Sequence, residues 1–337
     1  MPSETKQFPF YTGQPETPAA ETPARLSILG RNREREVAAY LADAGLIAAV
    51  NVALALGQPL LLTGEAGTGK TQLAYSLARE LGFEVLKFET KSTSSARDLF
   101  YNYDTLRRFH DAQLKQQLAS IDYITYAALG TAILRSNPKH VYAKWLNSSF
   151  EHRGPESSIV LIDEIDKAPR DFPNDLLNEV EGMYFKIPEL GMGDEKIVAN
   201  RELLPIVIIT SNSEKGLPVA FLRRCIFYNI PFPKPDRLAE IVLSHLRVSE
   251  TAKPHWFNDA LDFFGRLREP NQLEKVPSTA ELLDWFKYLK RAGLRDDDDL
   301  QSRKEVLISS MSALCKTVSD QERATPILEK WLSEQSK

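Results

Sequence analysis

The stretch from Leu60 to Thr71 constrains the fold of this chain more than any other part of the sequence. Three leucines and a threonine, typical of a buried strand, run into a turn that holds three glycines and ends in Lys70 and Thr71. The residues that follow, as far as Ala78, have helical spacing. The backbone N–H groups of such a turn can surround a polyphosphate only if no Cβ clashes with it and if φ can be positive where the turn requires it. Glycine meets both conditions. The stretch therefore predicts a strand, a phosphate-binding loop and a helix.

The residue types of this loop also predict how it holds a nucleotide. The helix that begins at Lys70 presents unpaired N–H groups to a phosphate, and the Lys70 ammonium can reach the β and γ oxygens. Thr71 is placed to hold Mg²⁺. A glycine turn beside a surface lysine is the alternative, and the strand before the loop and the helix after it argue against that alternative. The expected nucleotide-binding residues are Gly64, Glu65, Ala66, Gly67, Thr68, Gly69, Lys70, Thr71 and Gln72.

Length and composition limit the classes of protein to which the chain can belong. Its 337 residues can form two compact domains, and a net charge of −4 argues against a surface built throughout for nucleic acid. The sequence has neither an apolar run as long as a membrane span nor a charged-then-apolar leader, so we expect a cytoplasmic protein. Cys225 and Cys315 lie far apart and the histidines lack metal-ligand spacing, so we expect neither a disulfide nor a structural zinc site.

A second buried strand carries two carboxylates at its end. Ser158–Ile162 is apolar without alternation, as expected for a strand covered on both faces, and Asp163 and Glu164 follow it. At the end of a parallel strand Asp163 can hold Mg²⁺ through water, and Glu164 can orient or deprotonate an attacking water. An acidic loop cap is the alternative. Asp166 and Lys167 are expected to form a surface ion pair rather than to act in catalysis.

Polar residues also flank two further predicted strands. The strand that begins at Pro205 ends in Asn212, which could bond a γ-phosphate or the attacking water. Asparagine is equally a common turn residue, so the sequence leaves this role open. Arg223 and Arg224 precede the last strand, Ile226–Ile230, and an adjacent pair of this kind usually lies on a solvated face. Taken alone, the arginine pair predicts no site.

The two ends of the chain differ in composition from its middle. Met1–Ala24 is rich in Pro, Thr, Glu and Ala, so we expect residues 1–36 to be a disordered tail or a docking arm. Residues 233–337 lack strand patterns and have helical spacing, which predicts a small α-helical domain. An aromatic cluster in the tail could dock on a neighbour, and it consists of Phe8, Phe10 and Tyr11.

Between these ends, residues 37–232 are expected to form an α/β core that carries two inserts. The first insert, near 92–128, contains the aromatic stretch Phe100–Phe109, which serves either a function or the packing of the loop. The second, near 183–202, has two strand-like runs around Gly191–Gly193 and predicts a protruding hairpin.

The order of these features resembles that of the AAA+ ATPases: a phosphate loop, a strand ending in Asp-Glu, a strand ending in Asn, an arginine before the last strand, and a helical C-terminal region. Within that class the hairpin and three stretches resemble the MoxR-like ATPases, namely Ala96–Tyr101, Phe172–Leu177 and Thr210–Glu214. The resemblance covers about Val37 to Lys290. It implies a P-loop NTPase core with a five-stranded parallel sheet flanked by helices, a C-terminal α-helical lid domain, ATP and Mg²⁺ as ligands, and a ring, expected to be a hexamer.

The resemblance also implies roles for individual residues. Glu164 matches the Walker B glutamate and Asn212 the first sensor. Arg224 matches the arginine finger, which acts on the nucleotide of the neighbouring subunit. Thr71 and Asp163 match the residues that hold Mg²⁺. The expected catalytic residues are therefore Glu164, Asn212 and Arg224, and the expected metal-binding residues are Thr71 and Asp163.

Three positions depart from the family pattern or leave it ambiguous. Arg223 stands beside the expected finger and is the second choice for that role. Where the lid of this class often carries a second sensor arginine, the chain has a predicted capping box that ends in Glu281, which cannot stabilise a γ-phosphate. Either another lid residue such as Arg268 replaces the arginine, or the lid is coupled less strongly to the nucleotide. Tyr126–Leu129 stands where relatives tend to have Gly-Pro.

From these features we expect an ATP-hydrolysing remodeller of a protein client, comparable to MoxR-like chaperones that work with a von Willebrand A-domain partner. A nucleic-acid motor or loader is the first alternative, and it is disfavoured because the sequence shows no helix-turn-helix, zinc module or basic tract. A nucleotide-gated scaffold with negligible hydrolysis is the second alternative. The missing sensor arginine is its only support.

Overall fold

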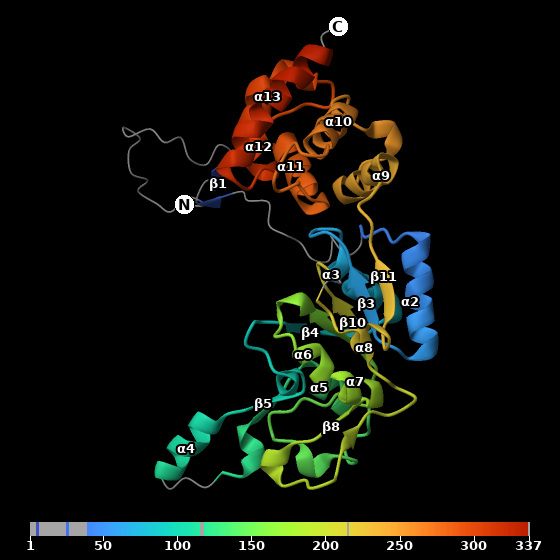
Figure 1. Ribbon diagram of the computed structural model, residues 1–337, viewed down its shortest axis with the longest axis vertical. Coiled ribbons are helices and arrows are strands. Elements are labelled where there is room, and N and C mark those ends of the chain that lie inside the picture. The colour runs from blue at the N-terminus through green and yellow to red at the C-terminus, as the bar shows by residue number, and fades with distance from the viewer. Residues whose placement is uncertain (1–4, 7–24, 27–38, 115–117, 214–215, 336–337) are drawn as a thin grey trace. The chain divides into compact units, whose positions relative to one another are not determined.

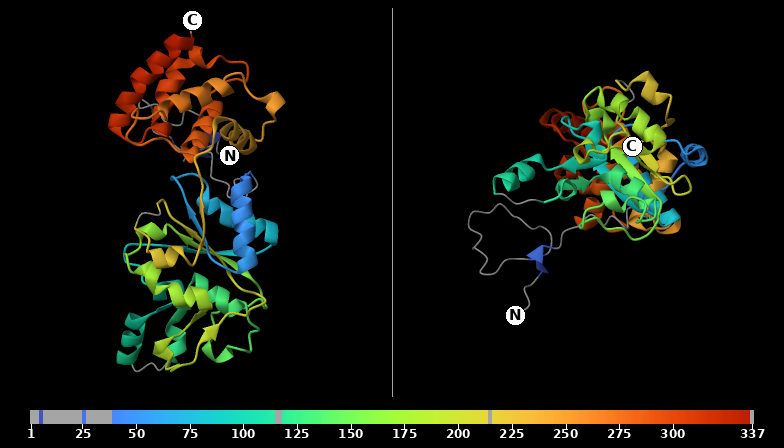
Figure 2. Two further views of the ribbon diagram at one scale, coloured as in Figure 1. Left: turned by 45° about the vertical axis from the view of Figure 1, so that its right-hand side comes forward. Right: turned by 90° about the horizontal axis from the view of Figure 1, so that it is seen from below.

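The computed structural model describes residues 5–6, 25–26, 39–114, 118–213 and 216–335. The chain forms two compact units, one of Leu41–Phe232 and one of Met1–Tyr40 with Pro233–Lys337. Figures 1 and 2 show the elements of both units from three sides. The aromatic cluster predicted in the tail lies outside the described residues.

The centre of the Leu41–Phe232 unit is a parallel sheet, to which the described residues contribute five strands (Figure 1). In chain order these are β3 Leu60–Thr63, β4 Glu84–Glu89, β7 Ser158–Asp163, β10 Ile206–Thr210 and β11 Ile226–Asn229. They lie in the order β11-β3-β10-β7-β4, and every neighbouring pair is parallel. The predicted five-stranded parallel sheet is confirmed, and the three strands expected to carry the site are neighbours at its centre.

Helices flank this sheet, because successive side chains of each strand point to opposite faces. Val160 and Ile162 of β7 belong to a buried cluster that includes most of α5 (Ala128–Arg135). Two further helices pack against the strands without joining that cluster: α3 (Lys70–Leu81) against β7 and β10, and α2 (Ala44–Leu56) against β3 and β11. Both faces of the sheet are therefore apolar, which explains why its central strands show no alternation.

Both predicted inserts contain a short antiparallel strand pair. In the first, β5 (Tyr101–Tyr103) pairs with β6 (Ile124–Tyr126), and α4 (Thr105–Gln113) lies between them in the chain. In the second, β8 (Tyr184–Phe185) pairs with β9 (Ile197–Val198). The prediction that this second hairpin protrudes is wrong, because its apolar side chains are buried in the core cluster: Phe185, Ile187, Met192 and Ile197.

Short helices complete this unit. The sequence from Phe172 to Glu181 predicts one helix, whereas the structure divides it at Leu176 into α6 (Phe172–Asp175) and α7 (Leu177–Gly182). The helix α8 (Val219–Leu222) precedes β11. Single turns of 3₁₀ helix connect the larger elements: η1 Ala96–Leu99, η2 Ser120–Tyr123, η3 Ala143–Trp145, η4 Ile165–Lys167 and η5 Pro188–Leu190.

The second unit is helical after residue 233, as predicted. Its α-helices are α9 Pro235–Leu246, α10 Phe257–Leu267, α11 Thr279–Arg291, α12 Lys304–Leu314 and α13 Val318–Gln335. Its shorter elements are η6 Glu250–Ala252, η7 Leu300–Arg303 and the parallel pair of β1 Thr5–Lys6 with β2 Arg25–Leu26. Large aromatic side chains form its core: Trp256, Phe263, Trp285, Phe286 and Trp331.

One helical prediction in this unit needs correction. The helical spacing from Leu300 to Val318 predicts a single helix there, whereas α12 ends at Leu314 and α13 begins at Val318. The helix α13 was not predicted from the sequence, because it contains Pro326 in its interior and proline normally argues against a helix. Among the described residues, no helix is both long and apolar enough to cross a membrane.

Candidate active site

The glycine loop connects the carboxyl end of β3, at Thr63, to the start of α3 at Lys70. Gly64 has a φ of +139°, and a Cβ there would come within 2.5 Å of the carbonyl oxygen of Ile230. Gly69, the residue before the helix, has a φ of +90°. Both conformations favour glycine, so the path of the loop depends on these two residues. The other predicted nucleotide-binding residues lie along the same turn or the first turn of α3: Glu65, Ala66, Gly67, Thr68, Thr71 and Gln72.

Lys70 is buried, and three oxygens surround its ammonium group. Its Nζ lies 2.8 Å from the carbonyl oxygen of Gly64, 2.9 Å from that of Glu65 and 3.1 Å from Oδ1 of Asn212. Burial lowers the pKa of Lys70, and nearby carboxylates, of which Asp166 is the strongest, partly oppose that effect. The lysine therefore links the glycine loop to the end of β10.

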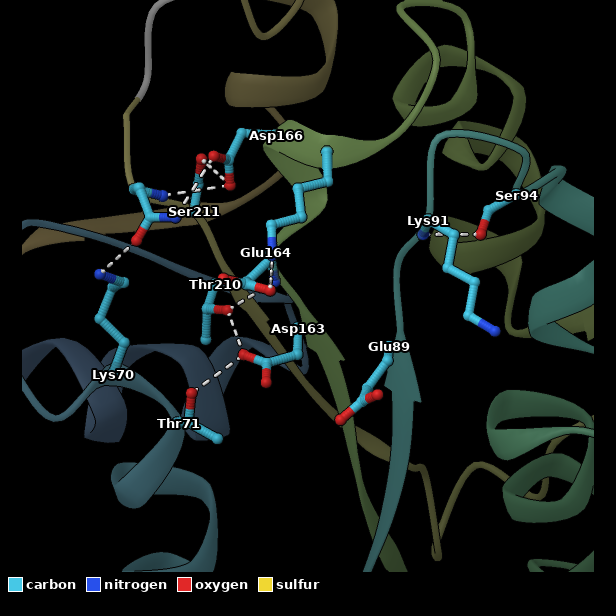
Figure 3. A network of polar contacts seen from close by, with 12 residues as sticks. Lys70, Thr71, Glu89, Lys91, Ser94, Asp163, Glu164, Asp166, Thr210 and Ser211 are labelled. Carbon is cyan, nitrogen blue, oxygen red and sulfur yellow. Dashed lines mark hydrogen bonds and ion pairs between the residues drawn. The ribbon is translucent and has the colours of Figure 1, made fainter. Parts of the chain in front are cut away.

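Asp163, at the end of β7, is contacted at both carboxylate oxygens. Thr71 donates to Oδ1 over 3.0 Å, and Thr210 donates to the same oxygen over 2.7 Å (Figure 3). The Nζ of Lys87 lies 2.9 Å from Oδ2. Burial by itself raises the pKa of Asp163, but the hydrogen bonds from Thr210, Lys87 and Thr71 outweigh burial and hold the pKa below its ordinary value. The structure thus brings together Thr71 and Asp163, the two residues predicted to bind Mg²⁺.

Two residues of this cluster, Thr210 and Lys87, were not predicted from the sequence. The hydroxyl of Thr210, at the end of β10, also accepts a hydrogen bond from the backbone N–H of Glu164. Lys87 stands between two apolar residues of β4 and forms a second ion pair with Glu89. Lys87 is exposed on the edge strand β4, so its place in the strand gave no signal that it belongs to the site. No local pattern could have found Thr210, because its place beside Asp163 depends on strand order.

Glu164 follows the carboxylate strand in a left-handed backbone conformation, with φ 57° and ψ 53°. Such a conformation is uncommon for glutamate, and conformations of this kind cluster at functional sites. The carboxylate of Glu164 forms an ion pair with Lys167. The predicted surface pair of Asp166 with Lys167 is therefore wrong, because Lys167 pairs with Glu164 instead. The role of Glu164 toward an attacking water stays a prediction.

Asp166 belongs to the polar cluster at the strand ends and orients Asn212. Its Oδ1 accepts hydrogen bonds from Ser211 Oγ over 3.2 Å and from the backbone N–H of Asn212 over 3.1 Å (Figure 3). Its Oδ2 accepts from Asn212 Nδ2 over 3.4 Å. Because the Oδ1 of Asn212 accepts from Lys70, the amide group is held at both ends. Asn212 thus lies beside the phosphate loop, as its predicted sensor role requires.

Comparison with protein families identifies the part of the chain that holds this cluster. Residues 59–225 match the family model described as AAA domain (dynein-related subfamily). This region is an AAA domain. The matched residues include the glycine loop, both carboxylates, Asn212 and the arginine pair. No curated protein matches the chain.

Several solved structures of RuvB from Thermotoga maritima are similar to this chain. The P216G mutant aligns with a TM-score of 0.46 at 16% identity, covering 79% of this chain and 67% of that chain. The structure described as the Holliday junction branch migration motor aligns with a TM-score of 0.43 at 15% identity, covering 80% and 66%. This chain thus spans about two thirds of the RuvB chains. Likenesses at this level of identity and TM-score carry no conclusion about function.

In the AAA domain, Arg224 lies at the edge of the sheet opposite the phosphate loop. β11 runs parallel to β3 with Ile226 beside Leu60, so Arg224 precedes the amino end of β11, whereas the loop follows the carboxyl end of β3. The Nε of Arg224 lies 2.8 Å from Oε2 of Glu181, and both side chains are exposed. The structure therefore does not bring Arg224 to the phosphate loop of its own chain. Arg223 also lines a cavity of about 350 Å³ with Arg224 and Glu181 at this edge.

The departure from the family pattern in the helical unit has a structural basis. The backbone N–H of Ser278 donates to Oε2 of Glu281 over 2.7 Å, which agrees with the capping box predicted at the start of α11. Arg268, considered as a replacement for the second sensor, donates to the carbonyl oxygen of Pro277 in the same unit. The carboxylate of Glu281 therefore caps the start of α11.

The carboxyl edge of the AAA domain fits a nucleotide with Mg²⁺. The loop keeps its path only with glycine at position 64, because a Cβ there would collide with the carbonyl oxygen of Ile230. The N–H groups that begin α3 lack partners within the helix and so favour an anion. Thr71 and Asp163 supply oxygen atoms, which Mg²⁺ prefers, and the ion usually keeps several waters and phosphate oxygens as its other ligands. The described residues contain no cluster of three or more His, Cys, Asp or Glu suited to a metal by itself. Bound Mg²⁺ would neutralise charge on the phosphates.

Proposed function

We propose that this chain is an ATP-hydrolysing chaperone of the MoxR-like kind, which remodels or activates a protein client. The observation that carries this proposal is the convergence of Lys70, Thr71, Asp163, Glu164 and Asn212 at the ends of three adjacent strands. Lys70 would balance phosphate charge, Thr71 and Asp163 would hold Mg²⁺, Glu164 would activate the water, and Asn212 would contact the γ-phosphate. Phosphoryl transfer needs little beyond such positioning and charge stabilisation.

A ring is part of the proposal, because Arg224 lies at the far edge of the sheet from its own phosphate loop. It can complete an ATP site only on a neighbouring subunit. We therefore propose a ring, a hexamer by family resemblance, with ATP between subunits. The cytoplasmic location and the von Willebrand A-domain partner rest on the sequence alone.

Two variants test hydrolysis. Lys70→Ala should abolish nucleotide binding, because it removes the charge that meets the phosphates. Glu164→Gln should bind ATP with nearly unchanged affinity and lose roughly 10²- to 10⁴-fold in turnover, because it removes only the group that acts on the water. Fluorescent-nucleotide titration and phosphate release measure the two effects. Normal turnover in Glu164→Gln would remove its assigned role, and a wild-type protein that binds no ATP would remove the proposal.

Assembly is measured separately by light scattering of the Glu164→Gln protein. A site between subunits links ATP binding to association by mass action, so ATP should increase the mass of the particle. A monomer at micromolar concentration in saturating ATP would contradict the ring. Stimulation of phosphate release by DNA or RNA, lost at high salt, would favour a nucleic-acid motor instead.

A further inference from the structure

Lys87 contacts two carboxylates that belong to different strands. Its Nζ lies 2.9 Å from Oδ2 of Asp163 on β7 and 2.6 Å from Oε1 of Glu89 on its own strand, β4. The register explains the arrangement, because Glu89 stands opposite Asp163 in the parallel pair and Lys87, two residues earlier, points to the same face. Figure 3 shows the two carboxylates at the ends of neighbouring strands. One ammonium group is therefore shared by two acids.

The lysine lies against the Asp163 oxygen that the two threonines do not use. Oδ1 accepts from Thr71 over 3.0 Å and from Thr210 over 2.7 Å. A carboxylate oxygen accepts about two hydrogen bonds, so these two occupy Oδ1 fully. Oδ2 is then the oxygen through which Asp163 can hold a water molecule of Mg²⁺, and Lys87 contacts it. The lysine and the ion thus require the same oxygen.

Two cations at one carboxylate oxygen oppose each other. Like charges that are close together near a protein surface repel, because water there screens them only in part. The ammonium of Lys87 therefore acts against a metal ion held at Asp163. Glu89 offers the same ammonium a second anionic partner, at 2.6 Å, and so acts in the opposite direction.

We infer that Lys87 weakens the binding of Mg²⁺ at Asp163, and that Glu89 moderates this effect by attracting the lysine to itself. The two β4 residues thereby set the Mg²⁺ concentration that tight nucleotide binding requires. The alternative is that Lys87 positions Asp163 for the ion, in which case removing the lysine would weaken metal binding. The inference rests on the proposed nucleotide site but does not require hydrolysis.

Titration of the full chain with a fluorescent ADP tests the inference without turnover. The ratio of the Kd in EDTA to the Kd in saturating Mg²⁺ measures how much the ion strengthens nucleotide binding, because the two ligands are thermodynamically linked. Lys87→Met should raise this ratio roughly tenfold, since it removes the competing cation. Lys87→Arg keeps the charge and should leave the ratio close to that of wild type.

Variants of two neighbouring residues separate the shared lysine from a general effect of charge. Glu89→Gln should lower the ratio roughly threefold to tenfold, because the lysine then turns fully to Asp163. In the Lys87→Met background the same change should have a smaller effect, because Glu89 acts through the lysine. Lys91→Met is the matched control, since it removes an exposed lysine two residues after Glu89 and should leave the ratio unchanged. Circular dichroism checks that each variant is folded.

Several outcomes would overturn the inference. An unchanged ratio in Lys87→Met would do so, and a lower ratio would assign Lys87 to positioning Asp163. Equal increases in Lys87→Met and Lys91→Met would mean that net charge, not the shared contact, is responsible. Equal losses from Glu89→Gln in both backgrounds would remove the role of Glu89.

Failure of this inference and failure of the proposed function are distinguishable. A wild-type protein that binds ADP with Mg²⁺ but does not hydrolyse ATP would remove the proposed activity and leave this inference in place. Normal hydrolysis together with an unchanged ratio in Lys87→Met would do the reverse. A wild-type protein that binds no nucleotide would remove both.

Discussion

The two edges of the central sheet differ in how completely this chain builds them. At the carboxyl edge Asp163 contacts three side chains from three different elements, and Asn212 is held from both sides. At the amino edge Arg224 has one ion pair, with Glu181, and both side chains are exposed. An exposed pair contributes about 0–1 kcal/mol, so Arg224 can change its partner at little cost. The carboxyl edge is thus organised within one chain, whereas the amino edge is suited to a second.

The largest effect is expected from removing Arg224 at the amino edge. Arg224→Ala should bind ATP almost normally and lose on the order of 10³ to 10⁵ in turnover, because an arginine finger stabilises charge that develops only in the transition state. Nucleotide titration and phosphate release measure the two quantities. A structural arginine would instead lower the stability and leave the rate per folded molecule similar.

Mixing two inactive proteins sharpens this prediction. A ring of Arg224→Ala and Lys70→Ala subunits contains interfaces that pair an intact Lys70 with an intact Arg224, so part of the activity should return. Subunit exchange must be demonstrated, for example by energy transfer between labelled proteins. If subunits exchange and no activity returns, Arg224 does not act on the neighbouring subunit.

A smaller effect is expected from loosening the carboxyl edge without removing a predicted catalytic group. Asp166→Asn weakens the acceptor that orients Asn212, so turnover should fall roughly 10- to 100-fold while the affinity for ATP changes little. The Ser211→Ala variant is a control, since it removes the bond of Ser211 to Asp166, together with its bonds to the Ser213 backbone, and leaves both bonds of Asp166 to Asn212. Equal losses in the two variants would mean that Asp166 supports the turn rather than the amide.

The pH dependence of stability tests how strongly the same edge is organised. The pKa of Asp163 is lowered in the folded chain, so the folded state takes up its proton at lower pH than the unfolded state does. Its contribution to stability is therefore present above the unfolded value of about 3.9 and is lost as pH falls through the folded pKa. The urea midpoint of the wild-type protein should fall more steeply below about pH 4 than that of Asp163→Asn. Parallel curves would show that the pKa is not lowered.

The smallest expected effect comes from the exposed pair at the amino edge. Glu181→Gln should change the free energy of unfolding by no more than about 1 kcal/mol, because both partners are solvated. Urea denaturation measures it, and Lys253→Gln, which breaks another exposed pair, gives the matched value. A loss well above that of Lys253→Gln would mean that the amino edge is organised within the chain after all.

Properties of consecutive residues determined much of this protein. The apolar runs at Leu60–Thr63 and Ser158–Asp163 predicted buried strands, and the glycines predicted the loop because few other residues accept its φ values. The helical spacing after residue 233 predicted the helical unit. These features depend on local backbone preference and on periodicity, which a sequence displays directly.

Only the tertiary structure decided which polar groups meet. Thr210 and Lys87 reach Asp163 because β10 and β4 lie on either side of β7, and strand order is not contained in any one strand. The contacts of Asp166 with Ser211 and Asn212 depend on strand order in the same way, whereas Lys167 pairs with Glu164, three residues earlier in the same turn. The hairpin near residues 183–202 was expected to project and is buried, while the apolar side chains of α4 are exposed. Whether the hairpin or the helix is buried depends on what the rest of the chain packs against it. An apolar pattern in the sequence shows which face of an element is apolar, but it does not show what covers that face.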